Sequence, residues 1–310
     1  MKRGTWGVAL SALVLSVCLG APAWAGSVGG DAGIGSWQQG AMIAGVGDYD
    51  WWYGCTPTST GMLLSVYDRV GYAGYVYGNL IPGGVAELET FTGPPTGSAA
   101  LASNAIASPG HISDFYGGGY GASGDDVAGP FHAFNCLADF MGTSQDSVSA
   151  SNGGTWLYYF SDGSPFTMAY ALAEGVQDNS GMYGIAEYIA YAGYGVKTLY
   201  NQLIEEGGQN YGFSLAQYIA EIDAGRPVLI HTENHTLCGV GYNEQDPTTI
   251  YVHDTWSLGP HTMTWGGTYG GKQQWGVTVL ELEAIPEPAT VLGIAAALTG
   301  LAGYLRRRAA

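Results

Sequence analysis

The sequence has few positive charges. Its 310 residues include nine Lys and Arg against 26 Asp and Glu, which gives a formal net charge of -17. Nucleic acids and anionic membrane surfaces attract basic proteins, so this balance argues against both as partners. Charged residues of either sign make up only 11% of the chain, whereas glycine is frequent at 51 residues. The composition is typical of a loop-rich exported protein rather than of a cytosolic helical one.

Cysteine is also scarce, with four residues in the chain. Cys18 lies in an N-terminal segment that has two basic residues, the apolar run 8–19 and the small-x-small sequence Ala23-Trp24-Ala25. Residues 1–25 are therefore predicted to be a secretory signal peptide that is cleaved before Gly26. Cys18 leaves with it. Three cysteines remain, and an odd number leaves at least one thiol free within a single chain.

The C-terminal end, residues 286–310, carries a second targeting pattern. Pro286-Glu287-Pro288 is followed by an apolar stretch of about 17 residues and then by Arg306-Arg307-Arg308. At about 1.5 Å per residue, one transmembrane helix of that length just crosses a bilayer, and the arginines hold its end on the cytoplasmic side. The pattern resembles the PEP-CTERM sorting signal of Gram-negative bacteria. That resemblance implies an exosortase as partner, a transient stay in the inner membrane, removal of the tail, and delivery to the cell surface or extracellular matrix.

Residues 26–285 form the predicted folded body, and almost all of the negative charge lies there. Five of the nine basic residues and one of the 26 acidic residues fall in the two ends. The body keeps four basic and 25 acidic residues, a formal net charge of -21.

The periodicity of the body indicates helices first and strands later. Helices are predicted at 57–70, 131–141, 183–191 and 215–224, the last capped by Ser214 and closed by Gly225. Strands are predicted at 156–160, 196–203, 228–232, 236–242 and 249–253, with a turn at 243–247. Residues 71–130 are dense in Gly, Ser, Pro and Tyr and are interpreted as loops with a few short strands. A helix followed by an antiparallel sheet makes an α+β domain.

Cys55 stands at the start of the first predicted helix, after an aromatic run and Gly54. Thr56 and Thr58 offer capping oxygens, and Pro57 suits a first helical turn. The positive end of the helix stabilises a thiolate and lowers the pKa of a thiol below about 8.5, which is how a cysteine nucleophile is usually activated. A small buried thiol in a core helix is the alternative, and for a cysteine considered alone it is the better one.

Two downstream residues change that balance. His235 begins one predicted strand run and Asp254 ends the next. Antiparallel neighbours joined by a short turn bring a His on one strand beside a carboxylate on the other. An Asp bonded to one imidazole nitrogen fixes the tautomer and leaves the other nitrogen to take a thiol proton. The predicted catalytic residues are therefore Cys55 as nucleophile, His235 as general base and acid, and Asp254 as the group that orients His235.

These motifs resemble the papain superfamily of cysteine peptidases. Gly54-Cys55 at a helix start, His235 before a Gly-Val-Gly-Tyr strand, and Asp254-Thr255-Trp256 match its pattern. The segment Gly225-Arg226-Pro227-Val228, and Asp rather than Asn as the third member, are more similar to the bacteriocin-processing peptidases that act on double-glycine leaders.

That resemblance implies a papain-like fold, in which the Cys55 helix packs on an antiparallel sheet that carries His235 and Asp254. It implies a peptide or protein substrate, no cofactor, and the Cys55 N–H as part of the oxyanion hole. The resemblance covers about residues 48–70 and 214–283. A Gly-rich insertion at about 71–205 is left unexplained.

One position departs from the family pattern. The superfamily usually has a Gln about six residues before the Cys, where it donates to the oxyanion. Here that position is Tyr49, and Gln38 and Gln39 stand at the wrong spacing. Two functions therefore stay open. One is an exported cysteine peptidase that cleaves peptide or related amide bonds, and the other is a weak or inactive papain-fold protein that serves as a binding or structural component of the surface or matrix.

Two patterns that suggest metal sites are weaker. His231 and His235 resemble a zinc-protease pair, but the Glu between them is at the wrong offset and the preceding residues indicate a strand. A Gly-rich loop holds a second group whose spacing fits no known calcium loop, so solvated acids are the default: His111, Asp114, Asp125 and Asp126.

The remaining chemically notable residues are interpreted as structural. Cys136 and Cys238 either form a disulfide in the oxidising exterior or are two buried thiols, and Cys238 is expected to point away from His235. His253 alternates with Asp254 along its strand, so it is expected to face the other way as a packed imidazole. The many Tyr and Trp residues are mostly core, with a binding rim as the alternative.

Overall fold

The protein is described by a computed structural model that covers residues 28–29, 40–49, 51, 53–75, 77–78, 80–81, 105–107, 136–145, 150, 153–205 and 211–284. The predicted signal peptide, the sorting tail, Gln38 and Gln39, and the acidic loop 111–126 lie outside these residues. The strands are β1 (Val28–Gly29), β2 (Gly40–Met42), β3 (Asp48–Tyr49), β4 (Phe166–Thr167), β5 (Val196–Leu203), β6 (Val228–Thr232), β7 (His235–Asn243), β8 (Asp246–His253), β9 (His261–Thr264), β10 (Thr268–Tyr269) and β11 (Lys272–Leu282). The helices are α1 (Cys55–Arg69), α4 (Leu137–Phe140), α5 (Met168–Glu174), α6 (Gly181–Tyr191) and α7 (Leu215–Asp223), with a short 3-10 helix at Gln177–Asn179.

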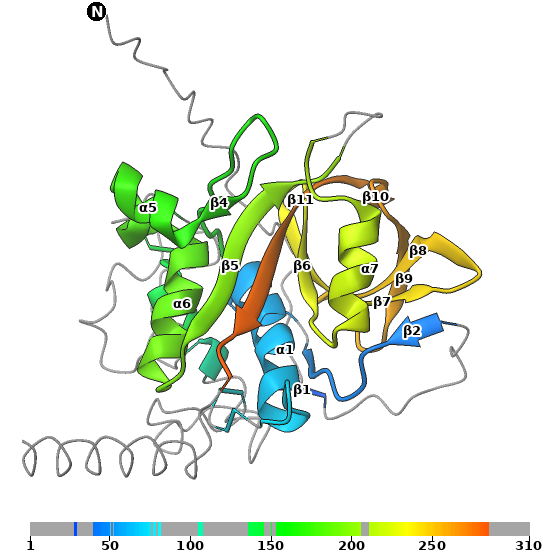
Figure 1. The fold of residues 1–310 in the computed structure, drawn as a ribbon, viewed down its shortest axis with the longest axis horizontal. Helices are drawn as coiled ribbons and strands as arrows, with labels where there is room; N and C mark the ends of the chain where they lie inside the picture. Colours follow the sequence, from blue (N-terminus) through cyan, green and yellow to red (C-terminus); the bar gives the residue numbers. More distant parts are fainter. Residues whose placement is uncertain are drawn as a thin grey trace, which may run out of the picture.

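The main sheet runs through the middle of the described fold (Figure 1). Its strand order is β4-β5-β11-β6-β7-β8-β9, with β10 paired to β11 and β2 to β7. Every ladder between these strands is antiparallel. Together with the helices, this confirms the α+β class.

The two faces of the sheet bury alternate residues against different helices. Leu229 and Cys238 belong to one apolar core, which also holds the buried side of α1. Ile230 and Leu237 belong to a second core with Tyr218 of α7. Because successive side chains of a strand point to opposite faces, α1 and α7 lie on opposite sides of the sheet (Figure 1). Cys55 belongs to the core on the α1 side.

Several predicted elements are confirmed, with small changes at their ends. The helix predicted at 57–70 is α1 and begins two residues earlier. The helix at 183–191 is α6, and Ser214 with Gln217 forms a capping box for α7. Strand 196–203 is β5, and 228–232 is β6. The predicted turn 243–247 is shorter, because Asn243 pairs with Asp246 and Pro247 lies within β8.

Two local predictions are wrong. Thr56 and Thr58 do not cap α1, whose N-cap is Gly54 without a side-chain cap. Both lie inside the first turn, where the Thr58 hydroxyl donates to the Gly54 carbonyl at 2.6 Å. The segment 156–160, predicted to be a strand, belongs to no ladder. Its carbonyls accept instead from the Gly181 N–H and from the Asn201 side chain.

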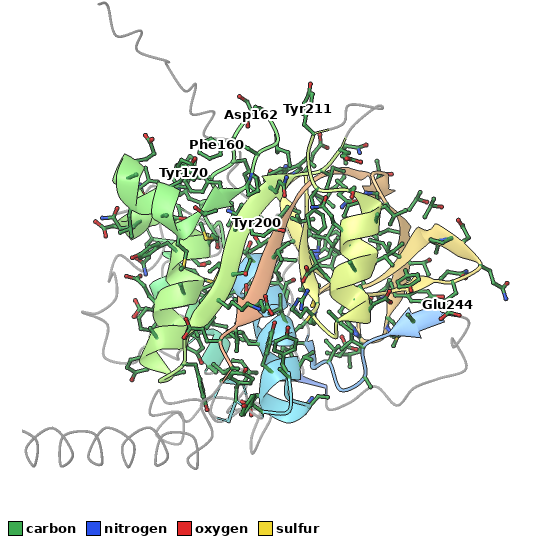
Figure 2. All side chains as sticks on the ribbon, in the orientation of Figure 1. Phe160, Asp162, Tyr170, Tyr200, Tyr211 and Glu244 are labelled. Atoms are coloured by element: carbon green, nitrogen blue, oxygen red, sulfur yellow. The ribbon has the colours of Figure 1, made fainter. Side chains whose placement is uncertain are left out.

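The later part of the predicted insertion is built into the sheet. β4 and β5 form one end of it, and α6 packs against β5. An aromatic layer covers this end, in which Phe160 and Phe166 lie 5.2 Å apart between ring centroids. Figure 2 shows Phe160 beside Tyr170 of α5, at a centroid distance of 4.9 Å.

Within the described residues, no helix has both the length and the apolar character needed to span a bilayer. The apolar stretch predicted to do so belongs to the C-terminal tail, outside that part of the chain.

Candidate active site

Cys55 is the first residue of α1, a helix of 15 residues, as the sequence predicts. The positive end of the helix therefore lies at its side chain. Gly54, just before it, has an extended backbone, and a Cβ there would lie 2.8 Å from the Gly153 carbonyl oxygen. This close approach explains the glycine and fixes the start of α1 against the segment at 153.

Direct contacts join the start of α1 to the start of β7. The Thr56 and Thr236 hydroxyl oxygens are 3.0 Å apart. The Ser59 hydroxyl donates to the Thr236 carbonyl at 2.9 Å. Thr56 follows Cys55 in the chain and Thr236 follows His235, so the nucleophile and the base predicted from the sequence are carried by adjoining backbone segments.

The Asp254 segment meets the same place from the other side. The Trp51 N–H donates to the carbonyl of Thr255, the residue after Asp254. The structure therefore brings together the three chain segments that carry Cys55, His235 and Asp254, although they are far apart in sequence.

The His235 imidazole is buried, with 1% of the residue exposed. Its Nε2 lies 2.7 Å from the main-chain carbonyl oxygen of Asp254. A carbonyl oxygen only accepts, so Nε2 carries the proton in the neutral ring and Nδ1 carries the lone pair. Burial lowers the pKa of His235 to about 4, against a partial upward effect of the Asp254 carbonyl. The ring stacks on Trp256 at a centroid distance of 3.9 Å.

The carboxylate of Asp254 has partners other than His235. It accepts from the Trp256 N–H at 2.9 Å, the Ser257 N–H at 3.0 Å and the Tyr269 hydroxyl at 2.7 Å. The sequence predicts a hydrogen bond between this carboxylate and the His235 imidazole. In the structure the imidazole bonds instead to the main-chain carbonyl of Asp254. The carboxylate folds the turn that places Trp256 over His235.

Three backbone positions next to the predicted residues have positive φ although none is glycine. They are Tyr53 at 73°, Asn234 at 55° and Thr255 at 62°. Asn234 lies in the turn between β6 and β7, where asparagine tolerates this region, whereas Tyr53 and Thr255 are strained there. Such strain collects at functional sites. Each of these residues lies within two positions of Cys55, His235 or Asp254.

The cysteines differ in state. Cys136 and Cys238 are buried thiols and do not form a disulfide, so of the two alternatives for this pair the structure has the second. Burial raises the pKa of the Cys238 thiol. Cys55 is disulfide-bonded here. A nucleophilic Cys55 must be reduced, and a chain without residues 1–25 would offer it only Cys136 and Cys238 as disulfide partners within the molecule.

Tyr49 does not take the place of the missing Gln. Its side chain lies along the middle of α1, since a Cβ on Gly61 would be 3.6 Å from its ring, and one on Gly47 would collide with its hydroxyl and with Ser65. Ser65 is ten residues beyond Cys55, about 15 Å along the helix. The Tyr49 hydroxyl is therefore remote from the start of α1.

A buried pair that the sequence did not suggest lies beside the site. Asp48 and His253 are 1% and 3% exposed, and their Oδ1 and Nδ1 atoms are 3.0 Å apart. The other carboxylate oxygen of Asp48 accepts from the Gly259 N–H. His253 is the packed imidazole that was predicted, and with Asp48 it ties β3 to the loop that follows Trp256.

The histidine pattern that resembles a zinc-protease pair forms no metal site among the described residues. His231 bonds to two threonine hydroxyls, at 3.1 Å from Thr236 and 2.8 Å from Thr278. In the part of the chain that the structure covers, no group of three or more His, Cys, Asp and Glu side chains could hold a metal ion.

Comparison with known proteins gives one family match. Residues 158–275 match the model of a protein family described as Peptidase_C39 like family. The match includes β5 to β8 with His235 and Asp254, and it does not include Cys55. No curated protein and no solved structure matches the chain. The family match supports a cysteine peptidase with a peptide or protein substrate, and it implies a papain-like fold.

The buried histidines give a prediction about stability and pH. Burial lowers the pKa of His231 to about 3 and that of His235 to about 4, whereas both titrate near 6.5 in the unfolded chain. The unfolded chain therefore binds more protons below pH 6.5, and stability is complete above pH 6.5 and declines as pH falls toward 4.

Replacing His231 with Gln should remove one such proton. Between pH 6 and pH 4.5, the slope of unfolding free energy against pH should then be smaller by about 1.4 kcal/mol per pH unit. Urea unfolding of wild type and H231Q at several pH values measures both slopes. Equal slopes would show that His231 is not buried as a neutral ring.

Proposed function

We propose that this protein is an exported cysteine peptidase in which Cys55 is the nucleophile and His235 the general base and acid. The observation that carries the proposal is the pair of bonds from Thr56 and Ser59 to Thr236, which holds the residue after Cys55 against the residue after His235. The position of Cys55 at a helix N-terminus and the Peptidase_C39 like match support the same function.

The tautomer of His235 assigns the proton transfers. Because Nε2–H donates to the Asp254 carbonyl, Nδ1 is the atom that takes the proton from the Cys55 thiol. The thiolate attacks the substrate carbonyl, and the Cys55 N–H stabilises the oxyanion. Nδ1–H then protonates the leaving amine. In the second step Nδ1 takes a proton from water, the resulting hydroxide attacks the acyl carbon, and Nδ1–H returns the proton to the departing sulfur. Cys55 and His235 are both buried, so the residues over them must move before a peptide reaches the sulfur.

One observation favours the second candidate, a papain-fold protein of low or no activity. The usual oxyanion Gln is replaced by Tyr49, whose side chain lies against the middle of α1. Loss of one oxyanion donor typically lowers the rate by about 10²–10³. Such a protein would serve as a binding or structural component of the surface.

Export and sorting complete the proposal. The N-terminal segment 1–25 would direct secretion, and the tail from Pro286 to Arg308 would be recognised by an exosortase after a transient stay in the inner membrane. The acidic body, with 25 acidic and four basic residues, would then stand at the cell surface or in the matrix.

The peptidase is tested with the reduced body, residues 26–285, on a peptide library. We expect cleavage that is abolished by C55A and retained by C136A, because Cys136 is a buried thiol with no role in the proposed chemistry. Cleavage that persists in C55A would refute the assignment. If wild type cuts no peptide although its Cys55 reacts with a thiol reagent, the second candidate is correct.

Asp254 gives a sharper test, because its carboxylate and its carbonyl have separate roles. D254N keeps an oxygen for the Trp256 and Ser257 N–H groups and leaves the carbonyl at His235 unchanged, so it should keep most of the activity. D254A loses the turn, and kcat/KM should fall about tenfold or more, since a hydrogen bond to a charged group is worth about 1.5–3 kcal/mol. A D254N enzyme as impaired as D254A would mean that the negative charge itself orients the imidazole.

The sorting proposal predicts the mass of the mature protein. Native material from the cell envelope should end before Arg308 and begin at about Gly26. Intact-mass measurement decides this. A mass that still includes the three terminal arginines would contradict processing of the tail.

A further inference from the structure

A chain of five buried polar side chains crosses the face of the sheet under α1. It runs from Asn201 on β5 through Thr278 on β11, His231 on β6 and Thr236 on β7 to Thr56 on α1. The successive distances are 2.6 Å, 2.8 Å, 3.1 Å and 3.0 Å. All five residues are at most 1% exposed.

The directions of the first two hydrogen bonds in this chain follow from its first member, Asn201. The Asn201 amide nitrogen donates to the Tyr158 carbonyl, so its Oδ1 accepts from the Thr278 hydroxyl. That hydroxyl has only one proton, hence it accepts from Nε2–H of His231.

The rest of the chain follows from a neutral His231, whose pKa burial lowers to about 3. A neutral ring with Nε2–H has its lone pair on Nδ1, which accepts from the Thr236 hydroxyl. Thr236 then accepts from the Thr56 hydroxyl. Each group in the network therefore has one possible direction of hydrogen bonding. In the resulting arrangement the Thr56 hydroxyl donates to Thr236 of β7.

The network ends at the residues next to the reacting groups. Thr56 shares a peptide bond with Cys55, and Thr236 shares one with His235. The Cys55 sulfur lies 3.9 Å from the Thr56 hydroxyl oxygen. Buried polar groups that are fully satisfied specify one arrangement of the elements that carry them. A fixed distance between nucleophile and base is what the proton transfer requires.

We propose that His231 is a positioning residue for the reaction: through Thr236 and Thr56, its imidazole holds the Cys55-bearing start of α1 in register with the His235-bearing start of β7. This rests on the proposed function. His231 touches neither the substrate nor the sulfur. Its Nδ1 accepts from the Thr236 hydroxyl, and this leaves the Thr236 oxygen oriented to accept from Thr56.

The first test uses isosteric removal of single hydroxyls. T56V and T236V break the chain, whereas T60V is the matched control, since Thr60 is equally buried in α1 and donates only to the Thr56 carbonyl in the same helix. The readout is the rate of Cys55 alkylation by iodoacetamide at pH 6, with Cys136 and Cys238 as internal references in each protein. Loss of register raises the pKa of the thiol, and one unit is tenfold in thiolate.

We expect alkylation of Cys55 to be about tenfold slower in T56V and T236V, with the rate rising to that of wild type only at higher pH, and unchanged in T60V. Equal rates in all three variants and wild type, with fast labelling of Cys55, would overturn the inference and leave the proposed function standing. If Cys55 of wild type reacts no faster than Cys136, the proposed function fails and the positioning role with it.

A second pair of variants keeps the test independent of stability. H231Q keeps one donor and one acceptor, while H231L has neither. The positioning role predicts near wild-type Cys55 labelling and kcat for H231Q, and a loss of both for H231L at temperatures where melting curves show each variant folded. Equal labelling in H231Q and H231L would overturn the inference, because their packing differs less than their hydrogen bonding does.

Discussion

The hydrogen bonds between the first turn of α1 and the second residue of β7 are the interaction on which the rest of the site depends. Thr56 and Ser59 both reach Thr236, one through its hydroxyl and one through its carbonyl. Without them, Cys55 would be a buried thiol at a helix end and His235 a buried ring at a strand end. With them, the two residues lie on adjoining backbone segments, as the proposed pairing of a nucleophile with a base requires.

The carbonyl and the carboxylate of Asp254 have different functions in the site. The main-chain carbonyl of Asp254 fixes the His235 tautomer, while its carboxylate folds the turn that stacks Trp256 on the ring. Asp48, paired with His253, holds the far end of that loop through Gly259. The strained backbone at Tyr53 and Thr255 lies next to Cys55 and Asp254, where these segments meet.

Much of this fold could be predicted from local sequence. α6 and α7 have capping residues and glycine stops, and β5 to β8 have strand-like patterns between turn residues. β11 was not predicted, although it is the longest of the described strands and lies between β5 and β6. Its first half has Gln273, Gln274 and Gly276, which do not alternate, and its central position depends on pairing with two strands far away in sequence.

The candidate site could be predicted only as far as side-chain chemistry reveals it. Cys55 and His235 stand out by residue type and by their places at a helix start and a strand start. The carbonyl of Asp254 could not be foreseen, since every residue has one. The Asp48–His253 pair joins positions 205 residues apart, and the place of Tyr49 depends on how β3 crosses α1. Neither feature can be predicted from the local sequence.

The central claim is that Cys55 and His235 form one ionisable pair, and the ¹⁵N NMR titration of the His235 ring tests it most directly. In the reduced body, a thiolate at Cys55 should raise the pKa of His235, because an opposite charge favours the imidazolium. In C55A that charge is absent, and His235 should titrate near 4 with its proton on Nε2. H235Q assigns the signal. Identical titration curves in the reduced protein and in C55A would contradict the account.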